Sequence, residues 1–317
     1  MRRSILLISL VFVCLFSIGA NAPAQTAGVF EVRFDDSALT AQQQTELAPT
    51  LAATKSFWES VITGYQPGIT LDGIDVVVSA MPIDGPSNTL AFGGAGGFII
   101  EQGGFTFFTD AELNSSAGSV TIDTADFSSP LIVDVLNHEV GHALGFGTLF
   151  DLNSLAPNPG QYTGSGGLTA YQAEFDSNAT SVPLQNETLP DGTIIFNFHL
   201  DEANPLSDAF GRTAQAALMT PTAENTTNAK DPFSNFLSDT SLGIFRDLGY
   251  ETVDTTFVAR EIQLGDVNQD GAVDFLDISP FISILSTDDF LEEADINQDG
   301  TVDFLDISPF ITILSNN

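Results

Sequence analysis

Residues 131–147 read LIVDVLNHEVGHALGFG, and this stretch carries the most informative pattern of the chain. Its apolar residues recur every three or four positions, which predicts a helix with one buried side. His138 and His142 are four residues apart, so both imidazoles project from one face of that helix and can reach a single zinc ion at about 2.0–2.1 Å. Glu139 lies beside them, where its carboxylate can accept a proton from a metal-bound water.

The zinc site needs a third ligand, because a hydrolytic zinc holds three protein ligands and one open position for water. Gly145 and Gly147 end the helix and let the chain turn back past the metal. In the pattern HExxHxxGxxH the last position is a histidine, but here it is Thr148, whose hydroxyl is a poor zinc ligand. The chain has 3 His, so His199 is the predicted third ligand, with Asp151 as the alternative.

The chain before the zinc helix alternates between strand and helix patterns. Residues 30–34 alternate like a strand, residues 39–63 read as an amphipathic helix, and strand patterns follow in 69–83, 98–102 and 105–113. Glycine-rich turns separate these segments. The predicted fold class is therefore α+β, in which a twisted mixed sheet and the active-site helix place a zinc cleft below an edge strand.

The composition limits both the partners and the compartment of the protein. With 42 Asp+Glu against 8 Lys+Arg the net charge is −34, so phosphate backbones are repelled and nucleic-acid binding is excluded. Arg2 and Arg3 precede an apolar run and a small-residue cleavage site at 22–24, which predicts a signal peptide over residues 1–24 and a secreted protein. No stretch is long enough to cross a bilayer, so we do not expect an integral membrane protein.

The C-terminal end of the chain is a duplication. Residues 266–286 and 295–315 match at 18 of 21 positions. Each copy carries oxygen ligands at calcium-loop positions 1, 3, 5, 9 and 12, a glycine at position 6 and a backbone carbonyl at position 7. Two calcium ions are therefore predicted, and folding of this end should depend on them because the carboxylates of a loop repel one another. The predicted ligands are Asp266, Asn268, Asp270, Ala272, Asp274 and Asp277 in the first loop, and Asp295, Asn297, Asp299, Thr301, Asp303 and Asp306 in the second.

Aspartate at position 12, where an EF-hand has glutamate, resembles the type I dockerin when it occurs in a tandem pair. The resemblance covers residues 262–317 and implies a small all-α, EF-hand-like module that docks on a cohesin partner. Positions 10 and 11 help to set partner choice in that family, and here they are Phe-Leu at 275–276 and at 304–305. Ser-Pro at 279–280 and 308–309 predicts an N-cap followed by proline at the first helical position.

The central part resembles the leishmanolysin-like metalloproteases, the metzincin branch with an insertion before the third zinc histidine. Besides the zinc helix, the likeness rests on His199, on Leu-Met-Thr-Pro at 218–221, on residues 160–175 and on an amphipathic helix within 237–250. The chain departs from the family by lacking the disulfides of leishmanolysin and by matching only loosely around His199.

This resemblance implies a metzincin-like zinc protease domain over residues 25–253 and a linker over 254–261. It also implies that Met219 forms a Met-turn below the zinc, which His138, His142 and His199 would hold.

Together the patterns predict a secreted zinc endopeptidase that cleaves protein or peptide substrates and carries a calcium-dependent docking module. Glu139 is the predicted general base and later passes its proton to the leaving amine. Two alternatives stay open. The chain could be a non-catalytic, calcium-dependent assembly or adhesion protein with a degenerate zinc site, which Thr148 favours. It could also belong to a polysaccharide-degrading complex, because dockerins most often accompany such enzymes.

Overall fold

The structure is a computed structural model. The chain divides into two compact units, Met1–Phe257 and Val258–Asn317. The structure describes residues 30–317 apart from 87, 189–193, 209–211, 222–234, 255–263, 266, 268–272, 274, 286–293, 298–300 and 317. The predicted signal peptide and most of the predicted linker lie outside the described residues. Each unit is described on its own below.

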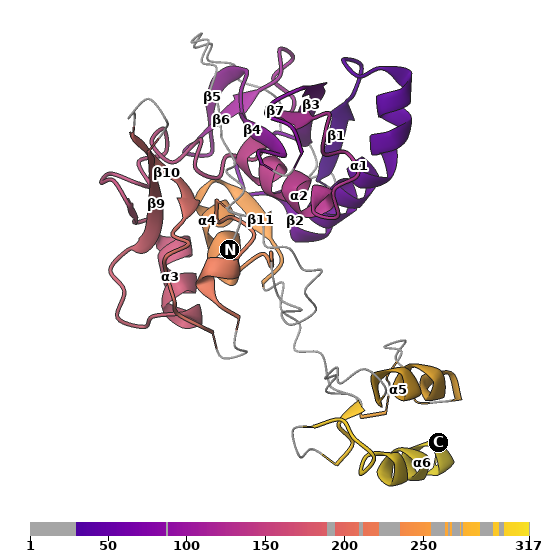
Figure 1. Cartoon of the computed structure of the whole chain (residues 1–317). Helices are drawn as coiled ribbons and strands as arrows, with labels where there is room; N and C mark the ends of the chain where they lie inside the picture. The colour runs from indigo at the N-terminus through magenta and orange to yellow at the C-terminus, as the bar shows by residue number, and fades with distance from the viewer. Residues whose placement is uncertain are drawn as a thin grey trace. The chain divides into compact units, whose positions relative to one another are not determined.

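The N-terminal unit combines a mixed sheet with helices, followed by a smaller sheet and two more helices (Figure 1). Its elements are β1 (Glu31–Asp35), α1 (Ala41–Val61), β2 (Ile62–Tyr65), β3 (Gly73–Met81), β4 (Ala91–Ala95), β5 (Phe98–Gln102), β6 (Phe105–Thr109), β7 (Ser116–Asp123), α2 (Ile132–Ala143), β8 (Gln161–Tyr162), α3 (Ser165–Glu174), β9 (Val182–Thr188), β10 (Ile194–Leu200), η1 (Ala214–Ala216), α4 (Asp239–Asp247) and β11 (Tyr250–Thr252). Across the described residues, no helix is both long and apolar enough to cross a membrane.

The larger sheet runs in the order β1-β3-β7-β6-β5, and β4 also pairs with β7. β1, β3 and β7 are parallel, whereas β4 is antiparallel to β7. Along β3 the side chains of Ile74, Val76 and Val78 are buried, while Val77 and Met81 on the opposite face are about half exposed. This period of two follows from the pleat, and it places the core on the face that α2 covers.

Helix α1 begins at a capping box, in which the Thr40 side chain accepts from the Gln43 N–H and Gln43 bonds back to the Thr40 N–H. Pro49 lies inside this helix without ending it. The helix is the 39–63 segment expected from the sequence, shortened by two residues at each end.

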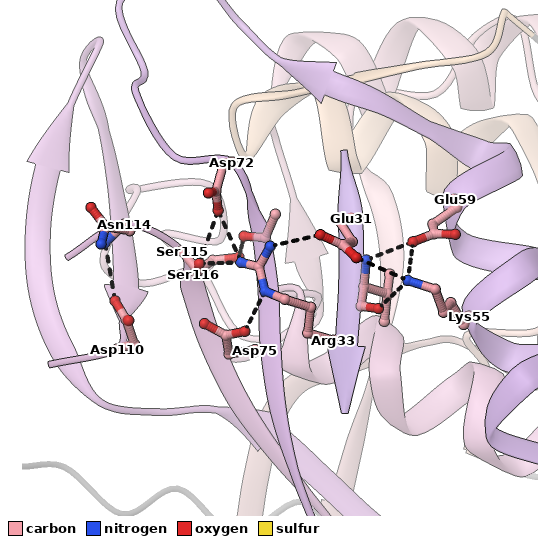
Figure 2. Close-up of polar contacts among 12 residues, drawn as sticks. Glu31, Arg33, Lys55, Glu59, Asp72, Asp75, Asp110, Asn114, Ser115 and Ser116 are labelled. Carbon is pink, nitrogen blue, oxygen red and sulfur yellow. Dashed lines mark hydrogen bonds and ion pairs between the residues drawn. The ribbon is translucent and has the colours of Figure 1, made fainter. Parts of the chain in front are cut away.

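The two basic residues near β1 join strands and helix through ion pairs (Figure 2). Arg33 on β1 donates to Asp75 at 2.7 Å and Asp72 at 2.9 Å and also pairs with Glu31. Lys55 of α1 donates to Glu59 at 2.6 Å and to the Val32 carbonyl at 2.7 Å (Figure 2). These cations are therefore engaged within the fold and carry little free positive charge at the surface.

Helices α3 and α4 pack closely because glycines face each other. A Cβ at Gly243 would lie 2.4 Å from the Gly166 carbonyl oxygen, so neither position has room for a side chain. Helix α3 starts at Gly164, which has no capping side chain, and Asp247 of α4 accepts hydrogen bonds from the Gly166 and Gly167 N–H groups at 2.8 Å instead.

An aromatic core joins the parts of the N-terminal unit. Tyr250 on β11 lies among the rings of Phe30, Tyr65, Phe107 and Phe245, with centroids 5.0–6.1 Å apart. Strand β11 pairs with β2, which follows α1 directly, so the end of this unit is tied back to its beginning. Gly249 has a φ of 98°, a left-handed conformation that ends α4 and lets the chain enter β11.

The C-terminal unit contains η2 (Phe275–Asp277), α5 (Ile278–Leu285) and α6 (Ile307–Asn316). The rings of Phe281 and Phe310, which are equivalent in the duplication, stack at 4.2 Å and form its core with Val267, Ala294 and Ile296.

The Ser-Pro pairs do not start the helices of this unit as predicted, so that prediction is wrong. Each helix begins one residue before its serine, directly after Asp277 or Asp306. A proline one residue further on is tolerated, because first-turn N–H groups have no intrahelical acceptor.

Candidate metal centre

Helix α2 carries the HExxH sequence and is buried on nearly all sides. Glycines on the sheet allow its close approach. A Cβ at Gly93 of β4 would lie 2.8 Å from the Glu139 carbonyl oxygen, and one at Gly118 of β7 would lie 2.6 Å from the Ala143 Cβ. The sheet therefore fixes the depth at which Glu139 and the two histidines lie.

The chain turns sharply after α2. Gly145 and Gly147 have φ angles of 113° and 72°, which glycine adopts without a Cβ penalty. Thr148, which stands where the HExxHxxGxxH pattern has its last histidine, donates its hydroxyl hydrogen to the His142 carbonyl at 2.9 Å. Its side chain therefore holds the turn in place.

His199 reaches the helix from β10, more than fifty residues further along the chain. The pairing of β10 with β9 shifts register between Phe196 and His199, and such a bulge re-aims the side chains that follow it. Gly147 lies directly against the strand, because a Cβ there would be 2.5 Å from the Phe198 carbonyl oxygen. The glycine turn and the bulge together place His199 beside the helix.

The three imidazoles of His138, His142 and His199 converge on one point. Their Nε2 atoms are 2.9 Å (His142–His138), 3.0 Å (His142–His199) and 3.2 Å (His138–His199) apart. These residues form the group of potential metal ligands found among the described residues, and all three are buried. Asp151, the alternative third ligand, is exposed and is not a member of this group.

The protonation of the rings shows that the cluster suits a cation. Nδ1 of His138 lies 2.6 Å from the Leu218 carbonyl and Nδ1 of His142 lies 2.9 Å from the Phe146 carbonyl. A carbonyl only accepts, so each Nδ1 carries the hydrogen and each Nε2 presents a lone pair to the cluster. Two lone pairs 2.9 Å apart repel each other unless a cation lies between them, and an ion about 2.0–2.1 Å from all three nitrogens fits this triangle.

Burial keeps the rings of His138 and His142 neutral, as metal ligands must be. Burial first, and then the nearby His199, lower the pKa of His138 to about 3. Burial followed by the proximity of His138 and His199 lowers the pKa of His142 as well. Imidazole ligands suit zinc, copper, iron and nickel, so the donor set is compatible with zinc.

Glu139 is fully buried, and among the described residues neither of its carboxyl oxygens has a hydrogen-bond partner of regular geometry. Burial raises the pKa of Glu139 to about 8, which the nearby N–H of Gly93 offsets only in part. A buried carboxyl group with so little hydrogen bonding is costly, and a raised pKa is typical of a residue that takes up and returns a proton.

Met219 lies under α2. A Cβ at Gly141, between the two helix histidines, would be 2.6 Å from the Met219 sulfur, so the thioether packs directly on the helix backbone. The Met219 carbonyl accepts from the Leu200 N–H at 2.9 Å, next to His199. Residues 218–219 therefore contact both histidine-bearing elements. The sequence did not predict which backbone groups support the site. These are the carbonyls of Leu218 and Phe146 and the glycines at 93 and 141, and only contacts between distant segments reveal them.

The close contact between Gly147 and Phe198 can be tested by substitution. Gly147→Ala adds a Cβ that collides with β10 at Phe198, so we expect His199 to be displaced and zinc occupancy of the purified protein to fall severalfold. Gly85→Ala is the matched control, because Gly85 has a similar φ of 85° with no atom within 4 Å of an added Cβ. Metal content by mass spectrometry measures both. Equal zinc in the two variants would show that the Gly147–Phe198 contact does not set the site.

The second candidate site is the pair of acidic loops in the C-terminal unit. Of the predicted calcium ligands, Asp277, Asp295, Asn297, Thr301, Asp303 and Asp306 are described, while Asp266, Asn268, Asp270, Ala272, Asp274 and Asp299 lie outside the described residues. The buried Asp306 carboxylate accepts from the Asn297 N–H at 3.0 Å and the Asp303 N–H at 2.9 Å. Loop position 12 therefore points back into its own loop, as a ligand at that position must. The equivalent Asp277 is also fully buried.

Comparison with known proteins identifies one domain. The family model of the dockerin type I domain matches residues 264–314, so the C-terminal unit carries a dockerin type I domain. Dockerin domains bind calcium, in agreement with the buried position-12 aspartates. A search of curated proteins gave no match to this chain.

Proposed function

We propose that this protein is a secreted zinc endopeptidase whose dockerin domain attaches it, with calcium bound, to a cohesin-like partner. One observation carries the protease proposal. Three buried imidazoles converge on a single point, and the buried carboxyl group of Glu139, which has no regular hydrogen bond within the described part of the chain, follows the first of them on the same helix. Metal-assisted hydrolysis uses this combination of three ligands and a base.

The proposed chemistry assigns one task to each group. His138, His142 and His199 would hold the ion, and the Leu218 and Phe146 carbonyls keep two of the rings oriented. Zinc, when bound, supplies a water activated at neutral pH and polarises the carbonyl of the scissile bond. Glu139 takes a proton from the attacking water and returns it to the leaving amine.

Strand β4 is the proposed support for the substrate. It lies against Glu139 through Gly93, and within the described part of the chain β7 is its one partner strand. An extended peptide can add to such a free edge through main-chain hydrogen bonds, which holds the substrate straight across the site.

The dockerin domain supports the proposed extracellular location and the proposed cohesin-like partner. Proteins with this domain are typically extracellular or attached to a cell surface, in line with the expected signal peptide. Phe275 and Phe304, at position 10 of the two loops, are 80% and 79% exposed. A partner that covers these rings would remove apolar surface from water, so we expect an apolar contact face on the cohesin-like side.

The test of the protease is metal content by mass spectrometry together with hydrolysis of casein by the purified protein. One zinc per chain and casein cleavage that a chelator abolishes are the expected results. Zinc without hydrolysis of proteins would favour the assembly or adhesion alternative. A chain that takes up no zinc would leave only the calcium-dependent docking function.

Calcium should control the folding of the C-terminal unit. Asp306→Ala removes a buried carboxylate from its loop, so we expect one calcium fewer per chain and loss of the cooperative unfolding transition of this unit at low calcium. Thr312→Ala, on the exposed side of α6, is the control. Calorimetry with and without a calcium chelator measures the transition. An Asp306→Ala unit that unfolds like the control would contradict the ligand assignment.

A further inference from the structure

The chain contains one tryptophan, Trp58, and it is fully buried in the last turn of α1. Its indole N–H donates to the Asn137 carbonyl of α2 at 3.1 Å. Asn137 directly precedes His138, so this hydrogen bond fixes the helix backbone one residue from a proposed ligand. A buried indole N–H needs an acceptor, and this one finds it on the helix that carries the metal site.

Trp58 also shares a contact with Met219. An atom added at Gly141 would meet the Met219 sulfur at 2.6 Å, the Met219 methyl at 2.9 Å and the Trp58 Cζ2 at 3.3 Å. The indole and the thioether therefore press on the same glycine, which lies between His138 and His142. The indole ring also packs edge-on against Phe245 of α4, with the ring centroids 5.2 Å apart, so the indole has little room to move.

The contacts extend to all three histidines. Leu218, next to Met219, accepts the Nδ1 hydrogen of His138, and the Met219 carbonyl accepts from Leu200, next to His199. His142 is one residue from Gly141. A shift of Trp58 would therefore be transmitted by direct packing to the backbone that sets each imidazole.

We propose that Trp58 is a positioning residue of the metal centre. Its contacts hold α2 and Met219 in the arrangement in which the three Nε2 atoms converge. The inference rests on the proposed metal site but not on proteolysis. It has a direct consequence, because the only indole of the chain packs on the helix between two ligands. Metal binding at the three Nε2 atoms will therefore change the fluorescence of Trp58.

The experiment compares Trp58→Phe with Tyr171→Phe in the full-length protein. Trp58→Phe keeps an aromatic ring and removes the N–H donor. Tyr171 on α3 is also buried, and its hydroxyl accepts one hydrogen bond from Asn204 at 2.7 Å, so Tyr171→Phe removes a buried hydrogen bond away from α2. The zinc Kd is measured by competition with a chromophoric chelator. Losing a partner that orients a ligand weakens metal binding by about 10–100-fold, so we expect a Kd increase of at least about 10-fold for Trp58→Phe only.

Two results would overturn the inference. One is an equal zinc Kd in Trp58→Phe and Tyr171→Phe. The other is a wild-type tryptophan emission that stays constant while one equivalent of zinc binds, and this second measurement does not depend on how well the variant folds. Zinc binding without casein hydrolysis would contradict the proposed protease alone, and the Kd comparison would still decide the role of Trp58. A wild-type chain that binds no zinc would contradict the metal centre and the positioning role together.

Discussion

Replacing Glu139 with glutamine is expected to lower kcat/KM for casein by about 10²–10⁴-fold, the usual contribution of a general base. Glutamine has nearly the same shape, so the packing against Gly93 should stay. An amide cannot accept a proton from the attacking water. Zinc content should therefore remain at one per chain, because the three imidazoles are untouched and Glu139 is not among the converging ligands.

The matched control is Asp134→Asn, which also exchanges a carboxylate for an amide on α2. Asp134 lies in the first turn of that helix and accepts a hydrogen bond from Asn235 at 2.9 Å, away from the cluster. We expect it to keep most of its turnover. Full activity in Glu139→Gln would refute the general-base role. Loss of zinc along with activity would show instead that the carboxylate is needed to build the site.

His199→Ala is expected to abolish both stable zinc binding and hydrolysis. The change removes one of three nitrogens that lie 2.9–3.2 Å apart, and two imidazoles with open positions hold a divalent ion poorly. Losing a hydrogen-bond partner of a ligand lowers metal affinity by about 10–100-fold, and losing the ligand itself should lower the zinc affinity further. Metal content after dialysis measures the effect.

Asp151→Ala is the control for this experiment, since Asp151 is the other ligand that the sequence allows. It is exposed and lies outside the converging group, so its loss should leave zinc and turnover close to wild type. Zinc retained in His199→Ala and lost in Asp151→Ala would mean that the chain rearranges around the metal. That result would also weaken the likeness to the leishmanolysin-like proteases.

Several elements could be predicted because their signals are local. The helix around His138 and His142, the strand at β3 and the helix at α4 follow from apolar spacing within single segments. The duplication and its loop spacing pointed to a calcium module, and the match of the dockerin type I domain at residues 264–314 supports that interpretation. The helix starts in the module were predicted wrongly, because the Ser-Pro pairs resemble a cap although each helix begins one residue before its serine.

Other features depend on residues that are far apart in the chain. His199 was predicted as the third ligand from the count of histidines and from the family resemblance, with Asp151 as the alternative. Only the structure shows that the bulge in β10 and the contact of Phe198 with Gly147 bring His199 beside His138 and His142. The same holds for the carbonyl partners of the imidazoles and for Trp58, whose acceptor is 79 residues away. Packing determines such pairs, and a single sequence has no local signal for them.

The amino-acid sequence was enough to predict two features. It put His138 and His142 on one face of a helix, with Glu139 next to the first of them, because a spacing of four residues is nearly one helical turn. It also put a repeated set of oxygen ligands at the spacing that wraps one calcium ion. The three-dimensional packing brings His199 to the other two histidines, buries Glu139 without a regular hydrogen bond among the described residues, and sets Trp58 and Met219 against Gly141 of α2. Convergence and burial arise when distant segments pack, and the glycines at 93, 118, 141 and 147 leave room for the close approaches around α2 and its histidines.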